Sequence, residues 1–397
     1  VQFLAGIVFA FLLFGLAGVL AEHVLKSEYC TLLIRVLAIF VFLRSMSSLL
    51  VGFLQGEGFE LPAAASGVIR PFLILGFSGL FSGKMVDYGV KVGNLLQDDH
   101  FAAMYSGVSV VLAVCVAELF CVIFLMILYK GCSMLSKQRR QEGLKSTDSI
   151  RTCINALFNG RYPLCVTECL AVFAMLAGFF FWNRTENTGD MFEMACSAYF
   201  QKYWVVYGVF VAVVFLLSIP VLNKTFEYIR KEDKRFARIS FQSGVHISMA
   251  HGIFFAVFGA VMAGQIVGLL KPTNQELVLA MLRMGSAIVA LSAVCFYYIR
   301  FLVSAGRKLH VMGAVILSTI LFTAGNSIVF FLGKWTEKTI VLTGVLIFVI
   351  LWILLGSLAY RLMRVRVDWL QVVVMPVGAG CVAGLIGMFL GKVFTPH

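Results

Sequence analysis

Three ionisable residues lie deep inside long apolar stretches of the chain. Arg44, Arg70 and Glu118 lie nine to eleven residues from the predicted cytoplasmic ends of three consecutive stretches, or ~14–16 Å at the ~1.5 Å rise per residue of a helix. A charge at that depth in a bilayer is costly, so it indicates a pairing or a functional site. Arginine stays charged at any depth and binds phosphate through two parallel hydrogen bonds. The three residues predict either a buried structural ion cluster or a polar cavity for an anionic headgroup.

Four further ionisable residues are candidates for the same site. Arg161 and Glu168 are seven residues apart, on one face of a predicted helix. Arg283 lies nearer the external face, where it either lines the cavity or extends to the surface. His251 lies near the midplane and either senses protons or packs against a neighbouring helix. We expect Arg161 and Arg283 to contribute to substrate binding, and Glu168 and His251, with Glu118, to act as counter-ions or in ion coupling.

These residues must be positioned by membrane-spanning helices. A helix that crosses the ~30 Å hydrocarbon core needs about 20 mostly apolar residues, and a barrel would show shorter alternating segments. We predict an all-α polytopic membrane protein with about eleven transmembrane helices. The expected spans are 1–20, 31–54, 61–83, 104–129, 162–182, 203–222, 242–270, 277–299, 311–332, 340–360 and 370–394.

The composition supports a membrane environment. Of 397 residues, 60% are hydrophobic and 13% charged, and the mean hydropathy is +0.94. Soluble domains have about 25% charged residues, so the composition excludes an ordinary soluble enzyme and a nucleic-acid-binding domain. The ten cysteines show no CxxC or CxxH spacing. We therefore predict no metal site, no cofactor and no nucleic-acid partner.

Positive charge predicts the orientation of the chain. The segments 130–152, 223–240, 300–309 and 361–368 carry 18 Lys and Arg residues, against 8 on the opposite side. By the positive-inside rule these four segments are cytoplasmic and the C-terminus is external. The first residue, Val1, already lies within an apolar stretch. We interpret the chain as lacking an N-terminal part.

Several segments resemble a known transporter family. They are IRVLAIFVFLRSM at 34–46, GFLQGEG at 52–58, PAAASGVIRP at 62–71, and the stretch 207–220 that precedes KEDK at 231–234. They are similar to the multidrug/oligosaccharidyl-lipid/polysaccharide flippase superfamily, in its polysaccharide-biosynthesis and stage V sporulation protein B-like branch. Val51 stands where that branch usually has Arg.

The resemblance implies two helical lobes around a central cavity, as in MATE proteins and lipid II flippases, working by alternating access. The expected parts are an N-terminal lobe at 1–129 without its first two helices, a basic cytoplasmic linker at 130–152, a C-terminal lobe at 153–361 and an additional helix at 362–397. The implied location is the bacterial plasma membrane.

The resemblance and the buried charges predict a flippase for a lipid-linked anionic oligosaccharide or polysaccharide precursor, not an enzyme. Its expected partners are that substrate, membrane lipids and a coupling ion, H⁺ or Na⁺. Arg44 and Arg70 would hold the diphosphate, with Glu118 as their counter-ion in the empty state. Three alternatives stay open. They are a cation-coupled multidrug exporter of the same superfamily, a scaffold subunit, and an intramembrane glycan-processing enzyme that uses the external loop 84–103 with Asp87, Asp98, Asp99 and His100.

Overall fold

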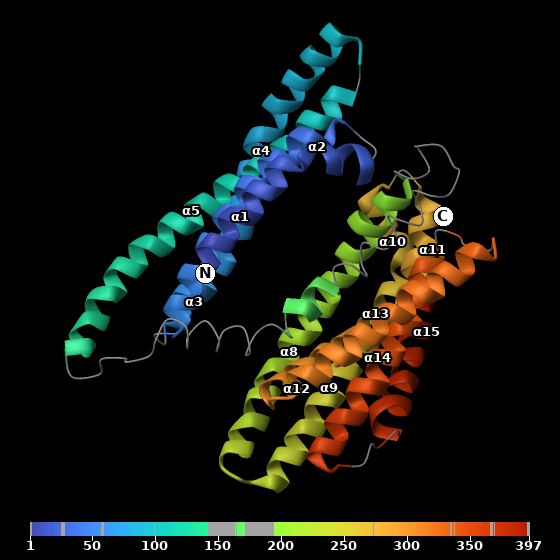
Figure 1. The fold of residues 1–397 in the computed structure, drawn as a ribbon. Helices are drawn as coiled ribbons and strands as arrows, with labels where there is room; N and C mark the ends of the chain where they lie inside the picture. The colour runs from blue at the N-terminus through green and yellow to red at the C-terminus, as the bar shows by residue number, and fades with distance from the viewer. Residues whose placement is uncertain are drawn as a thin grey trace. The chain divides into compact units, whose positions relative to one another are not determined.

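The computed structural model contains α-helices and short π-helical turns throughout the residues that it describes (Figure 1). The described residues are 2–24, 28–56, 59–98, 100–141, 163, 165–170, 194–272, 274–333, 336, 338–365, 368 and 370–394. The chain divides into two compact units, Val1–Asn155 and Ala156–His397. Each unit is described by itself below.

Unit 1 is built on three long helices. Helix α5 packs against both α3 and α4, and α1 packs against α3. The close approach of α1 and α3 depends on Gly6, because a Cβ there would lie 2.2 Å from Ser45 Oγ. The elements of the unit are α1 (Gln2–Gly15), α2 (Ala17–Val19), the π-helical turn η1 (Leu20–Val24), α3 (Cys30–Gly56), α4 (Glu60–Leu96) and α5 (His100–Gln141).

Unit 2 is a bundle in which α9 and α12 are central. Helix α9 packs against α8, α12 and α15, while α14 packs against α12 and α13. Its elements are the π-helical turn η2 (Ser197–Tyr203), α8 (Trp204–Arg230), α9 (Lys234–Val261), α10 (Ala263–Leu270), α11 (Gln275–Gly285), α12 (Ile288–Ser304), α13 (Lys308–Phe331), α14 (Thr339–Met363), the π-helical turn η3 (Leu370–Val374) and α15 (Met375–Phe394).

Seven helices among the described residues are long and apolar enough to cross a membrane, or up to nine if each of two bent pairs is one span. The bent pairs are Phe3–Gly15 with Ala17–His23, at 57°, and Gln275–Gly285 with Ile288–Ser304, at 50°. They fall in the predicted spans 1–20 and 277–299, and the bends could not be predicted, because hydropathy records apolar length and not helix direction. A shorter apolar helix, Leu370–Ile386, lies within the predicted last span, whereas most of the predicted span 162–182 lies outside the described residues.

Two helices extend far beyond their predicted spans. Helix α4 continues to Leu96, and α5 begins at His100. The predicted external loop at 84–103 is therefore wrong in extent, since among its described residues only 97 and 98 are outside a helix. Helix α5 also continues to Gln141, so the first part of segment 130–152 is helical. Polar residues end an apolar stretch, but they need not end a helix, because its backbone hydrogen bonds are internal.

Two tyrosines of unit 2 donate to carbonyls beside the break between α11 and α12. The Tyr207 hydroxyl donates to the Leu282 carbonyl, and the Tyr203 hydroxyl lies 3.4 Å from the Gly285 carbonyl oxygen. Both side chains are fully buried. A break leaves carbonyl groups of the helix without an N–H partner from the same helix. Buried hydroxyl groups that donate to these carbonyls therefore stabilise the bend. Gly285 is required because a Cβ would lie 2.3 Å from Tyr203 Oη.

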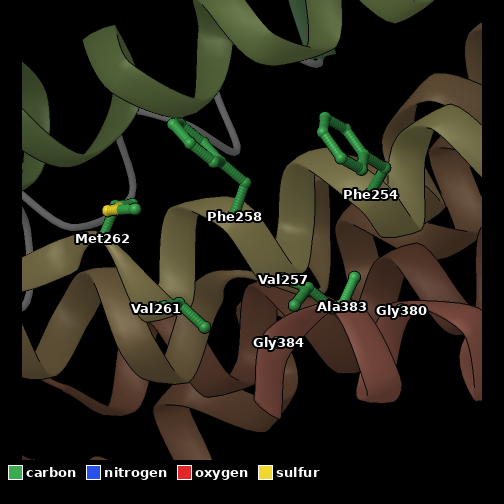
Figure 2. A pocket seen from close by; sticks show the side chains of 8 residues that line it. All are labelled: Phe254, Val257, Phe258, Val261, Met262, Gly380, Ala383 and Gly384. Atoms are coloured by element: carbon green, nitrogen blue, oxygen red, sulfur yellow. The ribbon is translucent and has the colours of Figure 1, made fainter. Parts of the chain in front are cut away.

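The C-terminal helix packs closely on α9 through two glycines. A Cβ at Gly380 would lie 2.8 Å from Ile253 Cγ2, and one at Gly384 would lie 2.8 Å from Val257 Cγ1. Small residues allow membrane helices to approach in this way. Figure 2 shows a small pocket at this contact, lined by Phe254, Val257, Phe258, Val261, Met262, Gly380, Ala383 and Gly384. Its lining side chains are all apolar, so the pocket offers no charged or hydrogen-bonding side chain to a polar headgroup.

Candidate functional site

The charged residues predicted at mid-depth in the second, third and fourth spans meet around one carboxylate in unit 1. Arg70 Nε lies 2.7 Å from Glu118 Oε2, and Arg70 Nη2 lies 3.3 Å from Oε1. Arg44 Nη1 approaches the same Oε1 at 3.5 Å. The Ser47 hydroxyl also donates to Oε1. The carboxylate thus accepts from side chains of two other helices, α3 and α4, and we call these four residues the Glu118 cluster.

Helix packing brings the cluster together. Arg44 and Ser47 are three residues apart on α3 and therefore lie on one face of that helix. Small buried residues on α5, Ala117 and Cys121, flank Glu118 and allow α5 to approach its neighbours closely. Because α5 packs against both α3 and α4, its carboxylate is positioned between the two arginines.

The two arginines differ in how firmly they are held. The Glu118 side chain is 0% exposed, that of Arg70 is 19% exposed and that of Arg44 is 47% exposed. Arg70 makes the shorter contact and uses two nitrogen atoms, which is the geometry of a strong charge-assisted pair. Arg44 makes one long contact, so most of its five N–H donors are directed elsewhere. Two guanidinium groups against one carboxylate leave the cluster with one excess positive charge.

Ser47 is the member of the cluster that the sequence analysis missed. Its side chain is fully buried, and its hydroxyl also lies 3.1 Å from the Arg44 carbonyl oxygen. A serine in an apolar helix commonly hydrogen-bonds within its own helix, so it gives little signal by itself. Its spacing of three residues from Arg44 was the available signal, because that spacing places both side chains on the same face.

The remaining predicted site residues belong to unit 2. Arg283, on α11, is exposed. His251, on α9, is also exposed, and its Nδ1 lies 2.9 Å from the Ile247 carbonyl oxygen of its own helix. Glu168 is exposed within the helical residues 165–170. Arg161 lies outside the described residues. A role for these four residues in substrate binding or coupling stays a prediction.

Two solved structures are similar to this fold. One is described as "Crystal structure of MATE in complex with MaL6", with a TM-score of 0.63, 13% sequence identity, and coverage of 91% of this chain and 77% of that chain. The other is described as "Crystal structure of MATE in the bent conformation", with a TM-score of 0.60, 14% identity, and coverage of 97% and 78%. No protein-family model and no curated protein sequence matches the chain.

These similarities confirm the predicted fold class, an all-α membrane protein with a MATE-like fold. Identities of 13% and 14% show the fold alone, because one fold hosts many activities. The chemistry of the site must therefore be argued from the Glu118 cluster.

Proposed function

We propose that this protein is a membrane transporter that moves a lipid-linked anionic saccharide from the cytoplasmic to the external leaflet. The observation that carries the proposal is the excess positive charge of the Glu118 cluster within apolar helices. An intramembrane charge is maintained where it has a partner or a function. Glu118 satisfies one guanidinium group and leaves the second only partly engaged. A phosphate or diphosphate group supplies the charge that would complete the pairing.

The asymmetry of the cluster assigns different roles to the two arginines. Arg70 is held at 2.7 Å by a fully buried carboxylate, so we assign to it the role of fixing the position of that carboxylate. Arg44 is half-exposed and 3.5 Å from the same carboxylate, so we assign to it the first contact with the anionic headgroup. The planar guanidinium group binds phosphate oxygens in a two-point contact that lysine does not reproduce.

Glu118 acts in this proposal as the counter-ion that the substrate replaces. In the empty state its carboxylate attracts Arg44, and a bound diphosphate competes for the same guanidinium group. Binding therefore exchanges one anionic partner of Arg44 for another, so that its guanidinium group stays paired within the membrane. A site of this kind can release its substrate, because the internal carboxylate restores the pairing. The alternating access that the family resemblance implies then carries the headgroup across.

A cation-coupled multidrug exporter is the second candidate function. Glu168 favours it, because an exposed acidic residue attracts a cationic compound. Glu118 does not, because it is fully buried and accepts from Arg70, Arg44 and Ser47. We favour the flippase, since the best-organised charges in the described residues would repel a cationic drug.

The test is a transbilayer assay with the full gene product in liposomes. A fluorescent lipid-diphosphate oligosaccharide is added, and its movement is followed by quenching for wild type, Arg44→Ala and Arg35→Ala. Arg35 is a matched control on the same helix, where its guanidinium group lies 5.6 Å from the centroid of the Phe14 ring. We expect Arg44→Ala to abolish movement and Arg35→Ala to retain it.

Two results would overturn parts of this proposal. Normal movement by Arg44→Ala would remove the headgroup role of Arg44. No movement by wild type, with or without ion gradients and a membrane potential, would overturn the flippase. Efflux of a cationic dye by the same liposomes would then establish the multidrug exporter instead.

A further inference from the structure

A second group of arginines lies at one end of unit 2, where α9 begins and α14 ends (Figure 1). Arg238 Nε donates to the Met363 carbonyl oxygen at 3.1 Å, which joins positions 125 residues apart. One turn deeper, the rings of Phe241 and Tyr360 pack edge to face with centroids 5.5 Å apart. These contacts hold Arg238 beside the last turn of α14. That turn contributes Arg361, and Arg364 follows it directly, so we call Arg238, Arg361 and Arg364 the α9–α14 arginine patch.

The patch is exposed, and hydrogen bonds hold its backbone in place. All three arginines are exposed. Arg364 ends α14 in the left-handed conformation at φ 51°, and its N–H donates to the Arg361 carbonyl oxygen at 3.2 Å. The patch also lies beside the N-terminus of α9, whose helix dipole adds partial positive charge. Its position is therefore fixed by hydrogen bonds, while its guanidinium groups remain accessible.

Two acidic residues near the patch, Asp233 and Asp368, are engaged with the backbone, whereas Glu232 beside Asp233 is exposed. Asp233 caps α9 by accepting from the Phe236 N–H at 3.2 Å. Asp368 accepts from the Gln371 N–H at 3.4 Å. A carboxylate that caps a helix or turn is oriented toward backbone donors. These two carboxylates therefore neutralise the patch only in part, and Lys234 and Arg235 offset the charge of Glu232.

Large apolar side chains are exposed at the same level as the arginines. They are Phe236 and Ile239 on the first turns of α9 and Leu362 on the last turn of α14. Phe236 also stacks on Tyr228 across the turn between α8 and α9, with ring centroids 5.6 Å apart. Apolar and aromatic groups mixed with arginine are typical of the interface between lipid headgroups and acyl chains. A soluble anion would bind the arginines without contacting these apolar side chains.

We propose that the α9–α14 arginine patch is a binding site for the phosphate headgroup of an anionic phospholipid, with the exposed side chains of Phe236, Ile239 and Leu362 against the upper part of its acyl chains. The site is separate from the Glu118 cluster, which belongs to unit 1, and does not depend on the transport proposal. Its function is to bind a resident lipid at the junction of α9 and α14.

The experiment measures lipid preference in phosphatidylcholine nanodiscs that contain the full protein. Fluorescent phosphatidylglycerol is titrated in, with fluorescent phosphatidylcholine as the neutral probe, and binding is read by energy transfer from tryptophan. The test variant is Arg361→Gln with Arg364→Gln. Arg238→Lys is a second variant that keeps the charge but alters the guanidinium contact to Met363. The matched control is Arg307→Gln with Lys308→Gln, which removes the same charge from the turn before α13 and from the first residue of that helix.

The expected result is a loss of about thirtyfold in the preference for phosphatidylglycerol in the test variant, from two juxtamembrane charges at about 1 kcal/mol each. The control should change by less than about twofold, because its two charges lie outside the patch. Arg238→Lys should weaken binding less than the double variant. Equal losses in the test and control variants would overturn the proposal in favour of non-specific attraction. An unchanged preference in the test variant, with thermal unfolding as in wild type, would overturn it as well.

Discussion

Arg70 and Glu118 form the tightest charge pair of the Glu118 cluster, with Arg70 Nε 2.7 Å from Glu118 Oε2 between α4 and α5. The pair fixes the position of a carboxylate that is 0% exposed, while Arg44 approaches it only at 3.5 Å and is 47% exposed. The structural and functional interpretations of these charges are therefore compatible. One arginine stabilises the helix packing, and the other is accessible to a ligand.

The first prediction separates these two roles by stability. Arg70→Ala leaves Glu118 buried without its closest charged partner, and breaking such a pair costs about 3–5 kcal/mol. Arg44→Ala removes a long and partly exposed contact and should cost less than about 1 kcal/mol. Chemical unfolding in detergent measures both variants. Arg70→Ala with Glu118→Ala should recover part of the loss, whereas equal losses from the two single variants would contradict the assigned roles.

The second prediction concerns the competition for Arg44 and rests on the proposed function. Glu118→Gln keeps the size of the side chain but removes the negative charge that competes with the substrate. We expect lipid-diphosphate to bind about tenfold more tightly, a change of about 1.4 kcal/mol, and to be released more slowly, so that transport slows. Binding in detergent and transport in liposomes measure the two effects. Weaker binding by this variant would show that Glu118 is not a competitor.

The third prediction is a pH dependence at the junction of α3, α4 and α5. The Tyr29 hydroxyl donates to Asp98, which also accepts from the His100 N–H at 3.0 Å. The hydrogen bond from Tyr29 lowers the pKa of Asp98 below its ordinary value of 3.8, and the same bond raises the pKa of Tyr29 above 10.0. The rings of Tyr29 and His100 also lie 5.3 Å apart, centroid to centroid.

Tyr29→Phe should therefore destabilise the protein only within a window of pH. The contribution of Asp98 to the stability of the folded protein is present above the pKa that Asp98 has in the unfolded chain. It is lost as the pH falls through the lowered pKa of Asp98 in the folded protein. The contribution of Tyr29 to stability is present below the pKa that Tyr29 has in the unfolded chain. It is lost as the pH rises through the raised pKa of Tyr29 in the folded protein. Thermal unfolding from about pH 3 to about pH 11 measures the difference between wild type and variant. Tyr105→Phe, on α5, is the control. A difference that stays constant at the acidic and basic ends would contradict the mechanism.

The fourth prediction concerns the packing of α9 on α12. A Cβ at Gly252 would lie 2.6 Å from the backbone Cα of Ala290, which cannot move without separating the two helices. We expect Gly252→Ala to lower stability by about 1–3 kcal/mol, the usual effect of overpacking. Gly264, on α10, has no atom within 4 Å of its ideal Cβ position, so Gly264→Ala is the matched control. Equal unfolding temperatures for the Gly252→Ala protein and this control would contradict the close approach of α9 and α12.

The Glu118 cluster shows how far sequence reasoning reached. Charged residues in an apolar stretch stand out by type, and counting along the stretch gives their depth, so Arg44, Arg70 and Glu118 could be predicted to lie at one level. Ser47 could not be distinguished in this way, because a serine hydroxyl is compatible with any position in a membrane helix. The same reasoning gave no signal that Arg70 would be anchored more tightly than Arg44. That difference depends on the rotation of three helices about their axes.

The sequence by itself determined that this is an all-helical membrane protein with charges inside its apolar stretches. The physical reason is that the cost of exposing a peptide group or a charge to hydrocarbon is local and can be read along the chain. The tertiary structure decided where helices bend, how far α4 and α5 extend, and which side chains meet at Glu118. Those features depend on neighbours distant in the sequence, such as Tyr203 and Tyr207 beside the break after Gly285, and no local property of the chain specifies such partners.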